Sequence, residues 1–277
     1  MSEPQPRDIA GFPGLYAEGE GERRPSPLVL LHGYWSDHDF MPTYLRFFSE
    51  AGFDCYIASR RGRRGVPPEH ARGLRVQDYV EDTLRVLDAV DGEAVVLGWS
   101  LGGLLAQKVA EAGRCLAAVL VASAAPADVR VFPPLAALPT YLRHLPELVL
   151  GRPFLPSYGS AQRTLLNRVP QADRRRLYEM MGPDSGIVGR EVAVTGVRVD
   201  ASRVHCPVLC LVGTDDNITP ARSVRRIAKK YGADLREYPG HGHWLPEEPG
   251  WEAIAGDILS WLETHVLPRG NVAAAGP

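Results

Sequence analysis

The chain has 277 residues, enough for two small domains or for one α/β domain that carries an insertion. Hydrophobic residues make up 45% of it and charged residues 23%, which is ordinary for a globular protein and excludes an intrinsically disordered one. The 31 basic and 33 acidic residues give a formal net charge of −2, so the sequence predicts no nucleic-acid partner.

The chain offers no candidate for a membrane span, and residues 1–12 lack the apolar core of a signal peptide. Cys55, Cys115, Cys206 and Cys210 lie in or beside apolar runs, without the spacing of metal ligands or of a disulfide framework. We therefore expect four thiols in a reducing cytoplasm. A zinc or redox role for the pair Cys206 and Cys210 is the minor alternative.

Short apolar runs alternate with amphipathic segments along most of the chain. Residues 1–26 are rich in Pro, Gly and Glu and predict at most one strand, near residues 15–18. The further predicted strands cover residues 27–31, 53–58, 94–97, 116–122, 207–212 and 234–238, and the predicted helices cover residues 42–52, 75–90, 101–112, 220–231 and 251–265. This alternation is typical of an α/β protein whose parallel sheet has helices on both faces.

The alternation stops at Pro126 and resumes near residue 204. The stretch between these points holds many prolines, apolar pieces such as residues 141–150 and a charged segment at residues 173–179. It is too long for an ordinary loop, so we interpret it as a mostly helical lid. The predicted division is a core of residues 1–125 and 204–266, a lid of residues 126–203 and a flexible tail of residues 267–277.

A G-x-S-x-G pentapeptide, Gly98-Trp99-Ser100-Leu101-Gly102, stands where a predicted strand meets a predicted helix. Such a sharp turn crowds the backbone, so glycines are needed on both sides of the serine. The turn would present the Ser100 hydroxyl at a helix N-terminus, where an oxyanion is stabilised. The alternative is a glycine-rich turn whose serine only caps the helix.

A nucleophilic serine needs a base, and the base needs a carboxylate that orients it. In a parallel sheet these groups come from loops at the carboxyl ends of strands. Asp215 and Asp216 follow one of the last two predicted strands, and His241 and His243 follow the other. Either aspartate could instead cap a helix, and the histidines could lie at the surface or bind a metal. The order Ser, Asp, His along the chain is that of one recurrent triad.

From about Leu28 to Leu262 the chain resembles an α/β-hydrolase of the lidded, single-domain kind. The matching motifs are the His32-Gly33 turn, the pentapeptide at residues 98–102, Gly213-x-x-Asp216-x-Ile218-x-Pro220, and Gly242-His243-Trp244 followed by Glu247-Glu248-Pro249. The resemblance implies the α/β-hydrolase fold, a mostly parallel twisted sheet with helices on both faces. It also places a helical lid after the sixth strand.

The same resemblance implies the catalytic roles. Ser100 would be the nucleophile, His243 the base and Asp216 the acid, in preference to the neighbouring aspartate and histidine. The backbone N–H groups of Tyr34 and Leu101 would form the oxyanion hole. No metal and no organic cofactor is needed for this chemistry.

One motif departs from the family. Relatives often have Asp-x-Arg-Gly-x-Gly after the fourth strand, but this chain has Ser59 in place of the aspartate and additional arginines between Arg60 and Arg64. The favoured interpretation is a solvated basic loop. The alternative is a docking site for an anionic carrier such as a phosphopantetheine or coenzyme A tail.

The predicted function is a serine hydrolase that cleaves a small-molecule carboxylic ester or thioester with an apolar acyl part. The apolar acyl part is inferred from side chains of the predicted lid: Phe132, Leu135, Leu138, Tyr141, Leu142, Leu145 and Phe154. Two alternatives stay open. The same triad could hydrolyse a C–C bond, open a lactone or catalyse a cyclisation, or the chain could bind a small molecule without turnover. Monomer and homodimer are both compatible with the sequence.

Overall fold

The computed structural model describes residues 3–63, 67–129 and 135–266, so the tail predicted at residues 267–277 lies outside the described residues. Within them the strands are β1 Gln5–Ile9, β2 Phe12–Ala17, β3 Leu28–Leu31, β4 Cys55–Ala58, β5 Val95–Trp99, β6 Ala117–Val121, β7 Val208–Gly213 and β8 Asp234–Tyr238. The helices are α1 Pro42–Glu50, α2 Val76–Asp88, α3 Leu101–Glu111, α4 Leu138–Arg143, α5 Leu145–Leu150, α6 Tyr158–Arg163, α7 Gln171–Met180, α8 Gly186–Arg190, α9 Ala221–Tyr231 and α10 Trp251–His265.

The eight strands form one sheet in the order β1-β2-β4-β3-β5-β6-β7-β8. All neighbours from β4 to β8 are parallel, and β1 and β2 add two antiparallel strands at one edge. The chain leaves β3 for β4 on one side and returns to β5 on the other. The crevice beyond the carboxyl ends of β3 and β5 is therefore a topological switch point, where ligands bind in open α/β sheets.

The edge hairpin of β1 and β2 is a difference from the sequence prediction, which allowed only one strand before residue 26. Pro6 and Pro13 lie within these two strands, although proline lacks the N–H that a sheet ladder uses. Ala10 and Gly11 join the two strands with positive φ angles of 59° and 84°. The favoured two-residue hairpin turns need such angles, and the Asp8 carboxylate accepts the Gly11 N–H at 2.8 Å.

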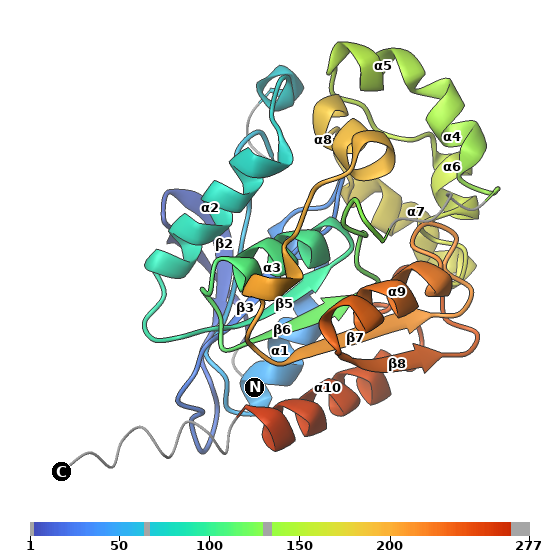
Figure 1. Ribbon diagram of the computed structural model, residues 1–277. Helices are drawn as coiled ribbons and strands as arrows, with labels where there is room; N and C mark the ends of the chain where they lie inside the picture. The colour runs from blue at the N-terminus through green and yellow to red at the C-terminus, as the bar shows by residue number, and fades with distance from the viewer. Residues whose placement is uncertain (1–2, 64–66, 130–134, 267–277) are drawn as a thin grey trace.

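Buried side chains alternate between the two faces of the sheet, as the two-residue period of a strand requires. Leu28 and Leu30 pack with α1 and α10 on one face, whereas Val29 and Leu31 pack with α2, α3 and α9 on the other. Figure 1 shows the same three layers, with α1 and α10 below the sheet and α2, α3 and α9 above it. The predicted fold class, a mostly parallel sheet with helices on both faces, is confirmed.

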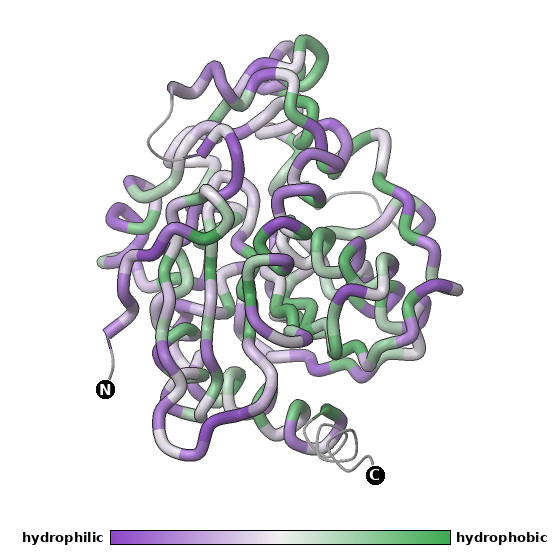
Figure 2. The backbone as a smooth tube through the Cα atoms, turned by 90° about the vertical axis from the view of Figure 1, so that its left-hand side faces the viewer, coloured by the Kyte–Doolittle hydropathy of each residue, from purple (hydrophilic) through white to green (hydrophobic). Residues whose placement is uncertain are grey.

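The segment between β6 and β7 contains α4 to α8, which gather at one end of the molecule in Figure 1. Figure 2 shows hydrophobic stretches both in the interior and at the upper end of the molecule, at the height where Figure 1 places α5. In the part of the chain that the structure describes, no helix has the length and apolar character needed to cross a membrane.

Candidate active site

Ser100 lies between the last residue of β5 and the first residue of α3. Its backbone has φ 57° and ψ −116°, a strained conformation for a residue with a side chain. A Cβ added at Gly98 would lie 2.1 Å from the Gly102 carbonyl oxygen, and one at Gly102 would lie 2.0 Å from that of Leu31. The turn therefore requires both glycines, as the sequence predicted, and it holds Ser100 in one fixed position.

The structure brings the three predicted triad side chains together. The Nε2 atom of His243 lies 3.0 Å from the Ser100 Oγ atom, and its Nδ1 atom lies 2.8 Å from Asp216 Oδ2. The three residues follow the carboxyl ends of β5, β7 and β8. The His243 and Asp216 side chains are fully buried, while Ser100 is 8% exposed at the wall of a pocket.

The Asp216 carboxylate is surrounded by donors. Its Oδ1 atom accepts the backbone N–H groups of Ile218 at 2.7 Å and of Thr219 at 2.8 Å. Its Oδ2 atom accepts the Thr219 hydroxyl at 2.6 Å and faces His243. A carboxylate held this way accepts from a protonated Nδ1 atom, so the neutral imidazole presents an unprotonated Nε2 atom to Ser100. That nitrogen can accept the Ser100 proton.

The two neighbouring candidates have other partners. The Asp215 carboxylate pairs with Arg168 at the surface, and its carbonyl oxygen accepts from the Asn167 side chain at 2.7 Å. The Nδ1 atom of His241 lies 3.3 Å from a Glu248 carboxylate oxygen. No group of three or more metal-ligating side chains occurs within residues 3–63, 67–129 and 135–266.

Two residues whose roles the sequence did not reveal hold the backbone around His243. Glu248 is buried, and its carboxylate accepts the N–H groups of Gly242 at 2.7 Å and Trp244 at 3.0 Å. Burial raises the pKa of Glu248, and hydrogen bonds from these two amides oppose that rise. The Trp99 indole N–H donates to the His243 carbonyl oxygen at 2.8 Å. Glu248 stood in a family motif, but only the folded chain shows what it binds.

The predicted oxyanion donors flank Ser100. Leu101 is the first residue of α3, so its N–H has no acceptor within the helix. Tyr34 belongs to the turn after β3. This turn packs closely against Ser100, since a Cβ atom added at the neighbouring Gly33 would lie 3.3 Å from the Ser100 Cβ atom. Burial raises the pKa of the Tyr34 phenol well above its usual value, and this hydroxyl donates to the Ser185 carbonyl oxygen at 2.6 Å.

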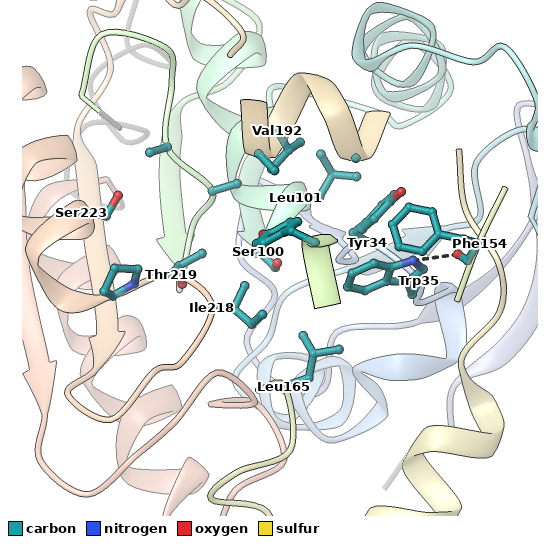
Figure 3. A pocket seen from close by; sticks show the side chains of 16 residues that line it. Tyr34, Trp35, Ser100, Leu101, Phe154, Leu165, Val192, Ile218, Thr219 and Ser223 are labelled. Atoms are coloured by element: carbon teal, nitrogen blue, oxygen red, sulfur yellow. Dashed lines mark hydrogen bonds between the residues drawn. The ribbon is translucent and has the colours of Figure 1, made fainter. Parts of the chain in front are cut away.

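A pocket opens in front of Ser100 (Figure 3). It is lined mainly by apolar side chains from the core and from the segment between β6 and β7: Tyr34, Trp35, Ser100, Leu101, Ala124, Ala125, Tyr141, Phe154, Leu165, Gly189, Val192, Ala193, Ile218, Thr219, Pro220 and Ser223. Its volume is about 110 Å³. For comparison, an apolar cavity of about 150 Å³ accommodates benzene. The pocket therefore fits a short apolar group beside the serine.

The seven apolar side chains of the predicted lid, from which the apolar acyl part is inferred, do not share one environment. Tyr141 and Phe154 line it, and the Trp35 indole N–H donates to the Phe154 carbonyl oxygen at 2.9 Å (Figure 3). Leu135, Leu142 and Leu145 are 80%, 64% and 52% exposed, so these three face solvent rather than the pocket. Leu138 is half-buried outside the pocket lining, and Phe132 lies outside the described residues.

Both interpretations of the arginine loop are wrong for Arg60 and Arg63. Arg60 and Arg63 are each 5% exposed and lie near the buried carboxylate of Asp184, so neither is solvated or available to an anionic carrier. Arg61 pairs with Asp82 on α2. Arg64 lies outside the described residues. Neither the distant Asp184 nor its burial could be predicted, because nothing in its local sequence distinguishes it from a surface aspartate.

His32, in the turn before Tyr34, gives the fold a predictable acid sensitivity. Burial lowers its pKa well below 6.5, and the charge of Arg60 lowers it further, against an opposing effect of Asp37. The folded state thus keeps His32 neutral while the unfolded chain binds a proton below about pH 6.5. Stability should therefore fall as the pH falls below that value, by up to about 1.4 kcal/mol per pH unit from this residue.

Urea unfolding at pH 7.5 and pH 5.5 measures this effect. We expect His32→Asn to lose less stability than the wild type between the two pH values, because asparagine does not titrate. An equal loss in both proteins would contradict the assignment of the acid sensitivity to His32.

Comparison with known proteins agrees with this geometry. The sequence profile of the alpha/beta hydrolase family matches residues 28–256. The chain is 27% identical to a non-heme chloroperoxidase of Streptomyces lividans, over 90% of this chain and 96% of that protein. It is 27% identical to a monoacylglycerol lipase of Mycolicibacterium smegmatis, over 86% of this chain and 88% of the relative. A crystal structure of the Paleococcus ferrophilus monoacylglycerol lipase superimposes with a TM-score of 0.70 and 24% identity, covering 90% of this chain and 98% of that one.

The class that the sheet and the strained serine turn define is therefore that of the α/β-hydrolases. The chain belongs to the alpha/beta hydrolase family, as the resemblance of its four motifs predicted, and it is a hydrolase.

Proposed function

We propose that this protein hydrolyses carboxylic esters with a short apolar acyl part through a Ser100-His243-Asp216 triad. The observation that carries the proposal is the continuous chain of two contacts, 3.0 Å and 2.8 Å, from the serine hydroxyl through the imidazole to the carboxylate. The serine at the start of this series of contacts lies at the wall of an apolar pocket. Nucleophile, base and orienting carboxylate are the three groups that acyl transfer requires.

In the proposed reaction the Ser100 Oγ atom attacks the ester carbonyl carbon while His243 Nε2 takes the hydroxyl proton. The carbonyl oxygen becomes an anion and accepts the Tyr34 and Leu101 N–H groups. Collapse of this intermediate breaks the ester bond, and the leaving alcohol receives the proton from His243. Water then attacks the acyl-serine with His243 again as the base, which releases the carboxylic acid and restores the serine.

The oxygen ester is favoured over a thioester on a large anionic carrier. The arginines that a carrier phosphate would bind are buried at Arg60 and Arg63 and engaged by Asp82 at Arg61. The relatives also support esters, since two of the three similar proteins described above are called monoacylglycerol lipases.

We further propose that residues 126–203 form a lid over a core of residues 1–125 and 204–266. Tyr141, Phe154, Leu165 and Val192 of this segment line the pocket together with residues of the core. A π-helical turn at Glu191–Thr195 carries Val192, and such turns are frequent at functional sites. Limited proteolysis should cut within residues 126–203 first, and cutting should slow when a covalent serine inhibitor is bound.

The size of the pocket predicts the acyl chain-length preference. With a p-nitrophenyl ester series from acetate to decanoate, we expect kcat/KM to be highest near butyrate and to fall for longer chains, because about 110 Å³ holds only a short group. Leu165 is buried and lines the pocket. Leu165→Ala removes part of the wall and should move the optimum to chains longer by about two carbons.

Leu177 provides a matched control, because it is equally buried in the same segment but does not line the pocket. Leu177→Ala and Leu165→Ala should both lower stability, by roughly 2–5 kcal/mol. Only Leu165→Ala should change the chain-length profile. An identical shift in both variants would show that loosened packing, rather than the pocket wall, sets the preference.

The compartment that we propose is the cytoplasm. Cys55, Cys115, Cys206 and Cys210 are all free thiols, and the sulfur atoms of Cys115 and Cys206 lie 3.8 Å apart without a bond. Unjoined thiols this close fit a reducing environment. Cell fractionation followed by immunoblotting should recover the protein with cytoplasmic markers, and recovery with secreted or periplasmic proteins would contradict the proposal.

A further inference from the structure

The turn that carries Tyr34 is held by a buried arginine. Arg60 donates from Nη1 to the His32 carbonyl oxygen and from Nη2 to the Gly33 carbonyl oxygen, both at 2.8 Å. The Ser36 hydroxyl donates to the same Gly33 oxygen at 2.9 Å. Arg60 and Ser36 therefore fix the direction of the Gly33 carbonyl group, whose oxygen also lies 3.2 Å from the Nδ1 atom of His32.

Fixing this carbonyl also fixes the oxyanion donor. The Gly33 carbonyl and the Tyr34 N–H belong to one planar trans peptide unit, so they point in opposite directions. On the other side of this unit, the Trp35 N–H donates to the Asp184 carboxylate at 3.3 Å. Trp35 has a φ of 63°, and a side-chain residue keeps such an angle only where its surroundings enforce it. The Tyr34 N–H thus lies between two anchored neighbours.

Arg60 is itself firmly placed. Its guanidinium lies over the Tyr79 ring, 4.9 Å from the ring centre, and 4.0 Å from a carboxylate oxygen of Asp184. Asp184 is completely buried and accepts the Tyr79 hydroxyl and, at 2.8 Å, the Ser185 N–H. A buried ion pair that is supported by further hydrogen bonds, here from both Nη atoms of Arg60 and to both oxygens of Asp184, holds one geometry, and breaking it leaves an uncompensated charge.

We propose that Arg60 is a positioning residue for the oxyanion hole. It sets the Gly33–Tyr34 peptide so that the Tyr34 N–H faces the oxygen that forms at Ser100. Through its buried carboxylate partner it also ties this turn to residues 126–203. The inference rests on the proposed function, because it concerns the transition state of the same acyl transfer. Arg60 touches no substrate atom and acts only through the backbone.

Arg63 is a matched control. It is as buried as Arg60, and it also lies near Asp184, with 3.4 Å between the nearest atoms. Among the residues that the structure describes, its other hydrogen bonds go to the carbonyl oxygens of Gly182 and Pro183, at 3.4 Å and 2.6 Å, and not to the turn. Replacing either arginine removes one positive charge beside Asp184, but only Arg60→Gln releases the Gly33 carbonyl.

The test compares Arg60→Gln with Arg63→Gln by two readouts, phosphonylation of Ser100 by a p-nitrophenyl alkylphosphonate and turnover of p-nitrophenyl butyrate. The phosphonyl oxygen occupies the oxyanion hole during the first reaction. Arg60→Gln should lower the phosphonylation rate constant and kcat by about 10- to 100-fold, with KM changed less than about threefold. Arg63→Gln should stay within about threefold of wild type in all three quantities, although both variants lower the melting temperature.

Two milder variants keep the test decisive if Arg60→Gln does not fold. Arg60→Lys retains the charge and should recover part of kcat, while Ser36→Ala removes the second donor to the Gly33 oxygen and should lower kcat about threefold without changing the buried charges. Equal effects of the Arg60 and Arg63 variants on kcat would overturn the inference and leave the proposed function intact. A wild type whose Ser100 does not react with the phosphonate would overturn both.

Discussion

Replacing Ser100 with alanine should abolish ester hydrolysis, with kcat lowered on the order of 10⁵- to 10⁶-fold. The reason is that Ser100 supplies the hydroxyl that contacts His243 Nε2, and removal of a catalytic serine elsewhere costs about this much. The fold should be retained, because alanine meets the same strained backbone angles as serine and leaves the contacts of Gly98 and Gly102 unchanged. Hydrolysis of p-nitrophenyl butyrate and a thermal melt measure the two effects.

Residual activity of Ser100→Ala within tenfold of wild type would contradict the serine mechanism. Titration of active sites with the alkylphosphonate guards against a contaminating esterase, because one equivalent of p-nitrophenol should appear for each wild-type chain. The alanine variant should release none above the background.

Replacing Asp216 with asparagine should lower kcat by about 10³- to 10⁴-fold. An amide at this position cannot stabilise the imidazolium and favours the wrong tautomer of His243, as a change of this kind does in another serine hydrolase. The side chain keeps its shape, so Ile218 and Thr219 can still donate to the remaining oxygen. Steady-state kinetics with p-nitrophenyl butyrate measure the loss.

Asp215→Asn is the control for this change. Asp215 is adjacent in sequence and carries the same charge, but its carboxylate contacts Arg168 instead of His243. We expect its kcat to stay within about twofold of wild type. If Asp215→Asn were the more damaging of the two, the assignment of the acid would be wrong.

The sequence allowed prediction of the parts of the site that depend on local pattern. Ser100 and Asp216 follow apolar runs typical of buried parallel strands, whereas His243 follows the short, mostly polar strand predicted at residues 234–238. The carboxyl ends of parallel strands meet at one edge of the sheet. The contacts among these three side chains follow from that geometry. Their catalytic roles stay a prediction until the variants are measured.

The parts that could not be predicted depend on distant partners. In the sequence, 123 residues lie between Arg60 and Asp184. Only folding brings these two charged side chains into the same buried cluster. The exposed Leu142 and Leu145 show another limit. Helices as short as α4 and α5 have too few turns for a periodic pattern to show which side is buried.

The measurement that tests the central claim most directly is covalent labelling with a fluorophosphonate, followed by peptide mass spectrometry. The wild type should carry the phosphonyl group on the peptide that contains Ser100, and His243→Gln should label far more slowly, because the base that activates the serine is missing. An unlabelled wild type, or a label on another residue while the fold is intact, would contradict an activated Ser100 and would favour a binding protein on a hydrolase scaffold.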